Sequence, residues 1–224
     1  METSQATTQP RTPLTRERIL RAAVTLADRD GFDSVTMRKL ADELGAGAMS
    51  LYHYVPHKDE LLAGMIDLVF GEIELPTTDV EWRTAMRRRA LSTRAALNRH
   101  RWAVGRMEGA HEGLANARMH DAVLGCLRQA GFSIEMTVQA MSVQDAYIYG
   151  FALQEKDLPF ETAQEGAAVA ERQGWDDEAL AKQFPYLAEV VAGHVARVGY
   201  DFGEAFEYGL DLILDALEQR RGAA

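Results

Sequence analysis

The residues best placed to do chemistry lie in a short stretch that follows a glycine-rich turn at residues 45–47. With about 100° of rotation per residue, a helix over this stretch puts the aliphatic Leu51 and Val55 on one face. The opposite face would carry small, aromatic and polar side chains: Ala48, Met49, Tyr52 and His53. A short helix with an aliphatic inner face and such an outer face can lie in the major groove of DNA and contact base edges and phosphates.

The stretch at residues 48–55, the reading stretch, needs further helices to hold it in place. The spacing of apolar residues predicts a helix over 16–29, with Thr15 as its N-cap. A second helix is expected over 37–44, capped by Thr36, and a third over 48–54. Two helices joined by a tight turn have the dimensions of a helix-turn-helix, although ordinary helical proteins also contain such pairs. Geometry alone therefore leaves both DNA binding and a plain helical module open.

The composition limits where nucleic acid could bind. The chain has 224 residues, 47% of them hydrophobic, and a formal net charge of −10. Residues 1–60 carry 8 basic and 9 acidic side chains, and the remainder carries 16 basic and 25 acidic. Because affinity for DNA comes mainly from Lys and Arg on phosphates, only the first part could approach a polyanion without strong repulsion.

Two further features bear on the compartment. No apolar run approaches the roughly 18 residues of a membrane helix, and the first dozen residues are polar, so a cytoplasmic protein without membrane contact is expected. The single cysteine, Cys126, predicts a buried thiol rather than a disulfide or a cysteine-rich metal site.

The rest of the chain also has the periodicity of helices, and no stretch shows the alternation of a half-buried strand. A fourth helix is expected from Lys58 until Pro76 interrupts it. Further helices are expected over 82–98, 102–107, 114–130, 133–155, 185–198 and 202–220. Residues 157–184, rich in small and acidic residues, are expected to form a loop with at most a short helix. The sequence therefore predicts an all-α fold.

The reading stretch and its neighbouring helices resemble the DNA-binding domain of the TetR family of bacterial repressors. The resemblance covers residues 14–73 without a gap and rests on Val-Thr-Met-Arg-Lys-Leu-Ala-Asp-Glu-Leu-Gly at 35–45, Ser-Leu-Tyr-His-Tyr-Val at 50–55 and Lys-Asp-Glu-Leu-Leu at 58–62. It implies a flexible tail at 1–13, a three-helix helix-turn-helix domain at 14–57, and a larger helical domain for ligand binding and dimerisation at 58–222 that starts with a connecting helix at 58–74. It also implies a homodimer whose two heads bind successive major grooves of a palindromic operator in double-stranded DNA.

By motif position, the resemblance assigns DNA contacts to nine residues. Arg38 would reach a base, with guanine N7 and O6 as the expected acceptors, and Tyr52 would contact a base or sugar edge. Lys58 would neutralise a phosphate at the start of its helix. Ala48 and Met49 stand where a tetracycline repressor often has a polar base reader, so apolar contacts, for example to thymine methyls, are expected there. The residues expected along phosphates are Met37, Ser50, His53 and Tyr54.

The C-terminal part resembles the tetracycline-repressor branch of the same family. This resemblance rests on Gly-Phe-Ser-Ile-Glu at 131–135 and on its spacing from Trp82. It places the drug-binding asparagine and phenylalanine of the branch at Arg89 and Thr93, and the metal-binding histidine at Met107. A thioether is too soft a ligand for Mg²⁺, so a magnesium–tetracycline ligand is not expected, nor is any other metal or cofactor.

A pocket for another small molecule is expected in the same domain. Met and Trp side chains suit an apolar or aromatic ligand, and Arg89 could pair with an acidic group on it. The alternative for each methionine is that it simply fills the core. The predicted pocket residues are Arg89, Thr93, Trp102, Met107, His111, His120, Met141 and Asp145.

The implied homodimer would form through helices 133–155 and 202–220 of both chains as a four-helix bundle. Burial of their apolar stripes inside one chain is the alternative. Residues 83–106 include eight arginines and no acidic residue. These arginines are expected to be solvated, to pair with the acidic C-terminal part, or in some cases to contact DNA. The stripe on the second helix comprises Phe206, Leu210, Ile213, Leu214 and Leu217.

Together these features predict a transcriptional repressor that binds its operator as a homodimer and is released by a small, apolar or aromatic molecule. A TetR-like activator and a ligand-independent repressor are the alternatives. An all-α enzyme is a remote alternative, because the sequence has no His-Glu-x-x-His motif, no phosphate-binding glycine loop and no nucleophile elbow.

Overall fold

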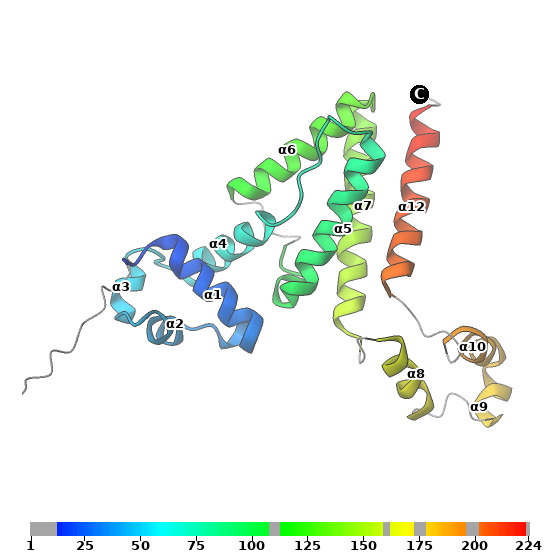
Figure 1. Cartoon of the computed structure of the whole chain (residues 1–224), viewed down its shortest axis with the longest axis horizontal. Coiled ribbons are helices and arrows are strands. Elements are labelled where there is room, and N and C mark those ends of the chain that lie inside the picture. Colours follow the sequence, from blue (N-terminus) through cyan, green and yellow to red (C-terminus); the bar gives the residue numbers. More distant parts are fainter. Residues whose placement is uncertain (1–12, 108–112, 159–161, 173–177, 196–201, 223–224) are drawn as a thin grey trace, which may run out of the picture.

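The structure is a computed structural model and describes residues 13–107, 113–158, 162–172, 178–195 and 202–222. Every regular element in these ranges is helical, which confirms the predicted fold class. The head, blue to cyan in Figure 1, consists of α1 (Arg16–Asp30), the short 3₁₀ turn η1 (Phe32–Ser34), α2 (Met37–Leu44) and α3 (Ala48–Tyr52). None of the described helices is both long enough and apolar enough to cross a lipid bilayer.

The head is held together by the caps and the small core that the sequence predicts. The hydroxyls of Thr15 and Thr36 each accept a hydrogen bond of 3.2 Å from the backbone N–H three residues further on. Gly45 ends α2 with a φ of +60°, a left-handed conformation that side chains disfavour. Leu51 and Val55 are completely buried, which confirms that they anchor the reading stretch to the rest of the head.

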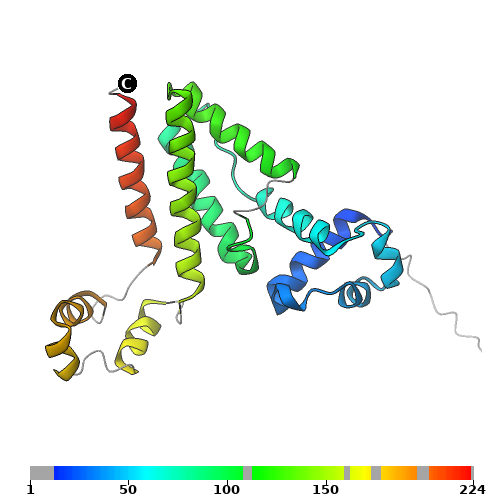
Figure 2. The same ribbon diagram turned by 180° about the vertical axis from the view of Figure 1, so that it is seen from behind.

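The helix α4 (Lys58–Phe70) connects the head to the remainder of the chain (Figures 1 and 2). It approaches α1 so closely at Gly64 that a Cβ there would lie 2.7 Å from Cδ2 of Leu20. At its other end α4 packs against α6 (Leu114–Gln129). α4 therefore contacts both the head and the C-terminal part.

Three long helices form the body of the C-terminal part: α5 (Trp82–Arg99), α7 (Ile134–Lys156) and α12 (Phe202–Arg221). They run side by side in both views of Figures 1 and 2, with α6 leaning against them. The core between them includes Ala90, Ile148, Phe206 and Leu210, all completely buried.

Ion pairs join α5 to α12. Arg87 donates to Glu207 at 2.6 Å and to Asp211 at 3.1 Å, and Arg83 pairs with Asp215 one turn further along. These contacts confirm the expectation that arginines of this helix pair with the acidic C-terminal part.

The apolar stripe of α12 lies inside the chain rather than at a surface. Phe206, Leu210 and Leu214 are completely buried, and Leu217 is 7% exposed. This is the alternative of burial within one chain, and it arises because α5 and α7 already cover this side of α12. The opposite side of α12 exposes other apolar residues, among them Tyr208.

Two predicted segments are wrong. The helix expected over 102–107 is reduced to the 3₁₀ turn η2 (Arg101–Ala103), because Gly105 takes a φ of +77° and leaves the helical path. The loop expected over 157–184 contains α8 (Ala163–Arg172) and α9 (Glu178–Gln183). α8 is rich in alanine, which has the highest helix propensity. Small residues are also common in loops, so the composition of this segment did not distinguish a helix from a loop.

Several helix ends also differ from expectation. α3 stops at Tyr52 rather than 54, because the N–H groups of residues 54 and 55 both bond to the Leu51 carbonyl ahead of Pro56. α4 stops at Phe70 rather than 74. The helix expected over 185–198 is α10 (Pro185–Val190) followed by a π-helical turn over Val191–Val195, and residues 196–201 lie outside the described residues.

The domain boundaries at 14–57 and 58–222 stay a prediction. The tail expected at 1–13 lies outside the described residues except for residue 13.

Candidate DNA-reading surface and ligand pocket

The side chains predicted to read DNA lie on the surface of α2, α3 and the start of α4. Met49 is 75% exposed, and Tyr52 and Tyr54 are 43% and 42% exposed. Met37 and Ala48 are half-buried against the head core. The remaining four predicted contacts are exposed: Arg38, Ser50, His53 and Lys58. The side chains are therefore accessible, and their contacts with DNA stay a prediction.

Asp28, near the end of α1, ties the head to the end of α5. Its Oδ1 accepts a hydrogen bond from Trp102 Nε1 at 2.7 Å and lies 2.8 Å from His100 Nδ1. The other ring nitrogen of the buried His100 lies 3.1 Å from the Glu72 carboxylate, just beyond α4. Partial burial acts to raise the pKa of Glu72, but hydrogen bonds from Arg99 and His100 outweigh it and lower that pKa.

A second connection runs through Asp67 of α4. Gly113, at the N-cap of α6, has no side chain to accept from the first turn, and Asp67 takes that place. Its Oδ1 accepts from the N–H groups of Ala115 at 2.9 Å and Asn116 at 3.1 Å. Asp67 and Asp28 could not be found from the sequence, because these partners lie 48 to 74 residues away along the chain.

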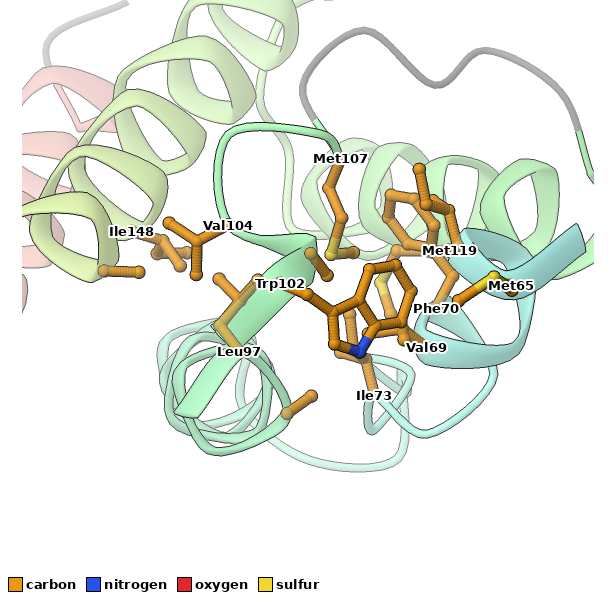
Figure 3. Close-up of a cluster of buried hydrophobic side chains, with 14 of the residues drawn as sticks. Met65, Val69, Phe70, Ile73, Leu97, Trp102, Val104, Met107, Met119 and Ile148 are labelled. Atoms are coloured by element: carbon orange, nitrogen blue, oxygen red, sulfur yellow. The ribbon is translucent and has the colours of Figure 1, made fainter. Parts of the chain in front are cut away.

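Two predicted pocket residues, Trp102 and Met107, lie in the hydrophobic core. They are 6% and 2% exposed. Figure 3 shows both within a cluster that includes Val69 and Phe70 of α4 and Met119 of α6. Their burial favours the alternative that Met107 fills the core, and a ligand contact by either residue stays a prediction.

Two further predicted pocket residues, Arg89 and Asp145, form a buried ion pair. Arg89 of α5 is 3% exposed, and its Nη2 donates to Asp145 of α7 at 2.5 Å. Thr93, one turn along α5, is completely buried and donates its hydroxyl to the Arg89 carbonyl at 2.8 Å. The acidic partner of Arg89 thus belongs to the chain itself. Because Arg89 is buried, this arginine does not contact DNA.

Two polar side chains on the packed helices α5 and α7 are incompletely bonded. Nε and Nη1 of Arg89 are buried and have no acceptor in the described part of the chain. Gln144, the neighbour of Asp145 on α7, is completely buried, and neither its side-chain nitrogen nor its oxygen bonds to a described residue. Gln144 is missing from the predicted pocket, although its spacing of four residues from both Ala140 and Ile148 places it on the buried face of α7.

The other predicted pocket residues are more peripheral. His120 is half-buried with Nδ1 2.9 Å from the Asn116 carbonyl, and Met141 is half-buried on α7. His111 lies outside the described residues.

Neither a metal cluster nor a reactive thiol stands out in the ranges that the structure describes. No group of three His, Cys, Asp or Glu side chains there could hold a metal ion. Cys126 is buried, and burial, with a smaller contribution from the Glu81 carboxylate, raises the pKa of its thiol.

The chain resembles known regulators over nearly its whole length. The family model described as bacterial regulatory proteins of the tetR family matches residues 19–65, and the one described as tetracyclin repressor-like, C-terminal domain, matches residues 75–221. The HTH-type transcriptional repressor DrrR1 of Streptomyces coeruleorubidus is 34% identical over 229 aligned positions, which cover 95% of this chain and 82% of DrrR1. The class A tetracycline repressor from transposon 1721 of Escherichia coli is 30% identical over 213 positions, covering 94% and 93% of the two chains.

Solved structures have the same architecture. Apo ActR from Streptomyces coelicolor superposes with a TM-score of 0.76 at 27% identity, over 95% of this chain and 99% of ActR. ActR in complex with actinorhodin gives a TM-score of 0.75 at 26% identity, over 94% and 100% of the two chains. Because family models match both its head and its C-terminal part, and DrrR1 is similar along most of both chains, the chain belongs to the TetR family of bacterial transcriptional regulators.

Proposed function

We propose that the chain is a repressor that binds a palindromic operator as a homodimer and is released by a small molecule. Its similarity to the repressor DrrR1 and to tetracycline repressors supports repression rather than activation. At the operator, Arg38 contacts a base, Tyr52 a base or sugar edge, and Lys58 a phosphate, while Ala48 and Met49 make apolar contacts. The remaining contacts, along phosphates, come from Met37, Ser50, His53 and Tyr54.

The observation that carries the ligand response is the pair of incompletely bonded buried side chains, Arg89 and Gln144. A buried polar group without a partner costs about 1–3 kcal/mol, so a ligand that supplies partners there gains binding free energy. Because Asp145 already neutralises Arg89, the remaining N–H groups need acceptors such as carbonyl or hydroxyl oxygens rather than an acid. Gln144 offers both a donor and an acceptor.

An aromatic molecule that carries several oxygen atoms fits these groups. The other residues proposed to line the pocket are mostly apolar, namely Trp102, Met107 and Met141. Thr93 and His120 are proposed as its polar lining. ActR has been solved in complex with actinorhodin and with (S)-DNPA, so a protein of this fold accommodates small molecules. The effector proposed here is therefore defined by its oxygen acceptors on an apolar body.

The proposed dimer uses apolar residues that one chain leaves exposed. On α7, Ile134, Val138 and Leu153 are 73%, 54% and 47% exposed, and on α12, Tyr208 and Leu212 are 70% and 54% exposed. Large apolar side chains gathered on two neighbouring helices indicate a protein interface. Packing α7 and α12 against the same helices of a second copy would bury them in a four-helix bundle.

Release would follow from the two connections to the head. A ligand that favours a different position of α5, α6 or α7 acts on the head through Asp67 and Asp28. The two heads of a dimer must lie roughly 34–36 Å apart to enter successive major grooves. A shift of α4 that changes this distance lowers operator affinity.

Selection of DNA from a randomised pool with the purified chain, followed by titration with salt, tests the DNA-binding part. A palindromic site is expected, with affinity that falls steeply as salt rises. Ala48→Gln is expected to change the preferred base opposite this residue, and Ala117→Gln on the exposed side of α6 leaves the preference unchanged. Failure to enrich any site at low salt would contradict the proposal, and a reporter gene that rises on binding would favour the activator alternative.

A further inference from the structure

A cleft of about 350 Å³ lies at the junction between the head and the C-terminal part. One wall is formed by the end of α1 and the turn after it, including Asp28 and Phe32. The other wall is formed by the ends of α5 and α7 and by the turn after η2. Figures 1 and 2 show the same end of α1 facing the ends of α5 and α7. The volume is in the range of small-molecule sites, roughly 300–1,000 Å³.

The wall opposite the head is strongly basic. It carries Arg99, Arg101, Arg106 and Lys156, in a chain whose net charge is −10. Two of these are already engaged, because Arg99 pairs with Glu72 at 2.7 Å and Arg101 donates to the carbonyl of Lys156 at 2.6 Å. Arg106 and Lys156 are the other two cations of this wall.

Arg106 and Lys156 have no carboxylate partner in the part of the chain that the structure describes. Arg106 donates one N–H to the Trp102 carbonyl at 2.7 Å, and its guanidinium carbon lies 4.8 Å from the centroid of the Phe32 ring. Both residues line the cleft and are only half-buried. A carboxylate or a phosphate accepts such charge-assisted hydrogen bonds best.

The head wall selects against a ligand that is negative throughout. Asp28 and Asp33 both lie on it, and Asp28 already accepts from Trp102. These two carboxylates would repel a second negative group, whereas they would not repel an uncharged end. We propose that this junction cleft binds a small organic anion, with its carboxylate or phosphate against Lys156 and Arg106 and its uncharged end toward the head.

An occupant of the cleft would touch both parts of the molecule at once. Asp28 lines the cleft and also forms the connection to His100 and Trp102. A ligand bound between the two walls therefore favours the present angle between head and C-terminal part over others. The cleft is a second control site, separate from the buried Arg89 and Gln144.

Equilibrium dialysis of the full chain, at constant ionic strength and without DNA, tests the site. The probes are 2-naphthoate and 2-naphthyl phosphate, with neutral 2-naphthamide as the matched control ligand; the first two distinguish a carboxylate from a phosphate preference. Lys156→Gln is expected to weaken binding of the preferred anion about tenfold, the loss typical of one charge-assisted hydrogen bond. Arg118→Gln, which removes one charge from the exposed side of α6, is expected to leave it unchanged.

Three results would overturn the proposal. The first is that wild type and Lys156→Gln bind both anions with equal affinity. The second is that wild type binds the amide as tightly as the anions. The third is that Gln144→Leu, and not Lys156→Gln, weakens binding of the anions, which would place the probes in the buried pocket. Because no DNA is present, the outcome does not depend on the proposed repressor function. A second titration then measures operator affinity with and without the preferred anion, and an unchanged affinity would contradict the control of the head angle.

Discussion

Replacing Asp67 with alanine should destabilise the chain by a predictable amount. The carboxylate accepts from two N–H groups at the start of α6, at 2.9 Å and 3.1 Å, and Gly113 cannot replace it. Loss of a helix N-cap costs about 0.5–2 kcal/mol, and the upper half of this range applies because Asn116 is only 2% exposed, which keeps water from its freed N–H. With roughly 2–4 °C lost per kcal/mol in a chain of this size, a loss of about 1–2 kcal/mol lowers Tm by about 2–8 °C.

Thermal unfolding followed by circular dichroism, at one fixed protein concentration, measures this effect. Asp67→Asn keeps an oxygen acceptor and should lose less than Asp67→Ala. The matched control is Asp121→Asn, which removes an exposed carboxylate elsewhere on α6. Equal unfolding temperatures of Asp67→Ala and Asp121→Asn would contradict this capping role of Asp67. If the proposed release mechanism is right, Asp67→Ala also responds more weakly to the effector, because α6 no longer holds α4.

Three further predictions concern the head connection, pH and the thiol. Asp28→Ala removes the acceptor shared by His100 and Trp102, so operator affinity in a gel-shift titration should fall several-fold; wild-type affinity would contradict the coupling. The pKa of Glu72 is lowered from its ordinary value of 4.5, so its ionised form stabilises the fold above that pH and this stability is lost as pH falls through the lowered pKa. Urea unfolding from pH 6 to pH 3 should therefore show a steeper loss for wild type than for Glu72→Gln, and parallel curves would argue against it. Burial raises the pKa of the Cys126 thiol, so iodoacetamide should modify the native chain far more slowly than the unfolded chain at pH 8; equal rates would mean that the thiol is exposed.

Local features of the head were predictable because they depend on near neighbours in the chain. Thr15 and Thr36 cap their helices and Gly45 ends α2, and each effect involves residues within one turn. The inner face of α3 followed from the spacing of Leu51 and Val55. The same local reasoning failed over 157–184, where small and acidic residues are compatible with both loop and helix.

Features that depend on distant contacts were not predictable. The apolar stripe along one side of α12 is compatible with both a dimer interface and burial within one chain, and only the packing of α5 and α7 shows that Phe206 faces inward and Tyr208 outward. The partner of Arg89 lies 56 residues away at Asp145. Periodicity indicates that a residue is buried, but it does not tell which other element meets it.

If the buried and incompletely bonded Gln144 serves to bind the effector, Gln144→Leu should weaken the release of the operator. The first measurement is the concentration at which an aromatic compound that releases the operator frees half of the bound DNA. The second is Tm. The control variant is Gln154→Leu on the exposed side of α7. We expect Gln144→Leu to be at least as stable as wild type, to bind the operator equally well, and to need about tenfold more compound for release. Lower stability with an unchanged releasing concentration would contradict this role of Gln144.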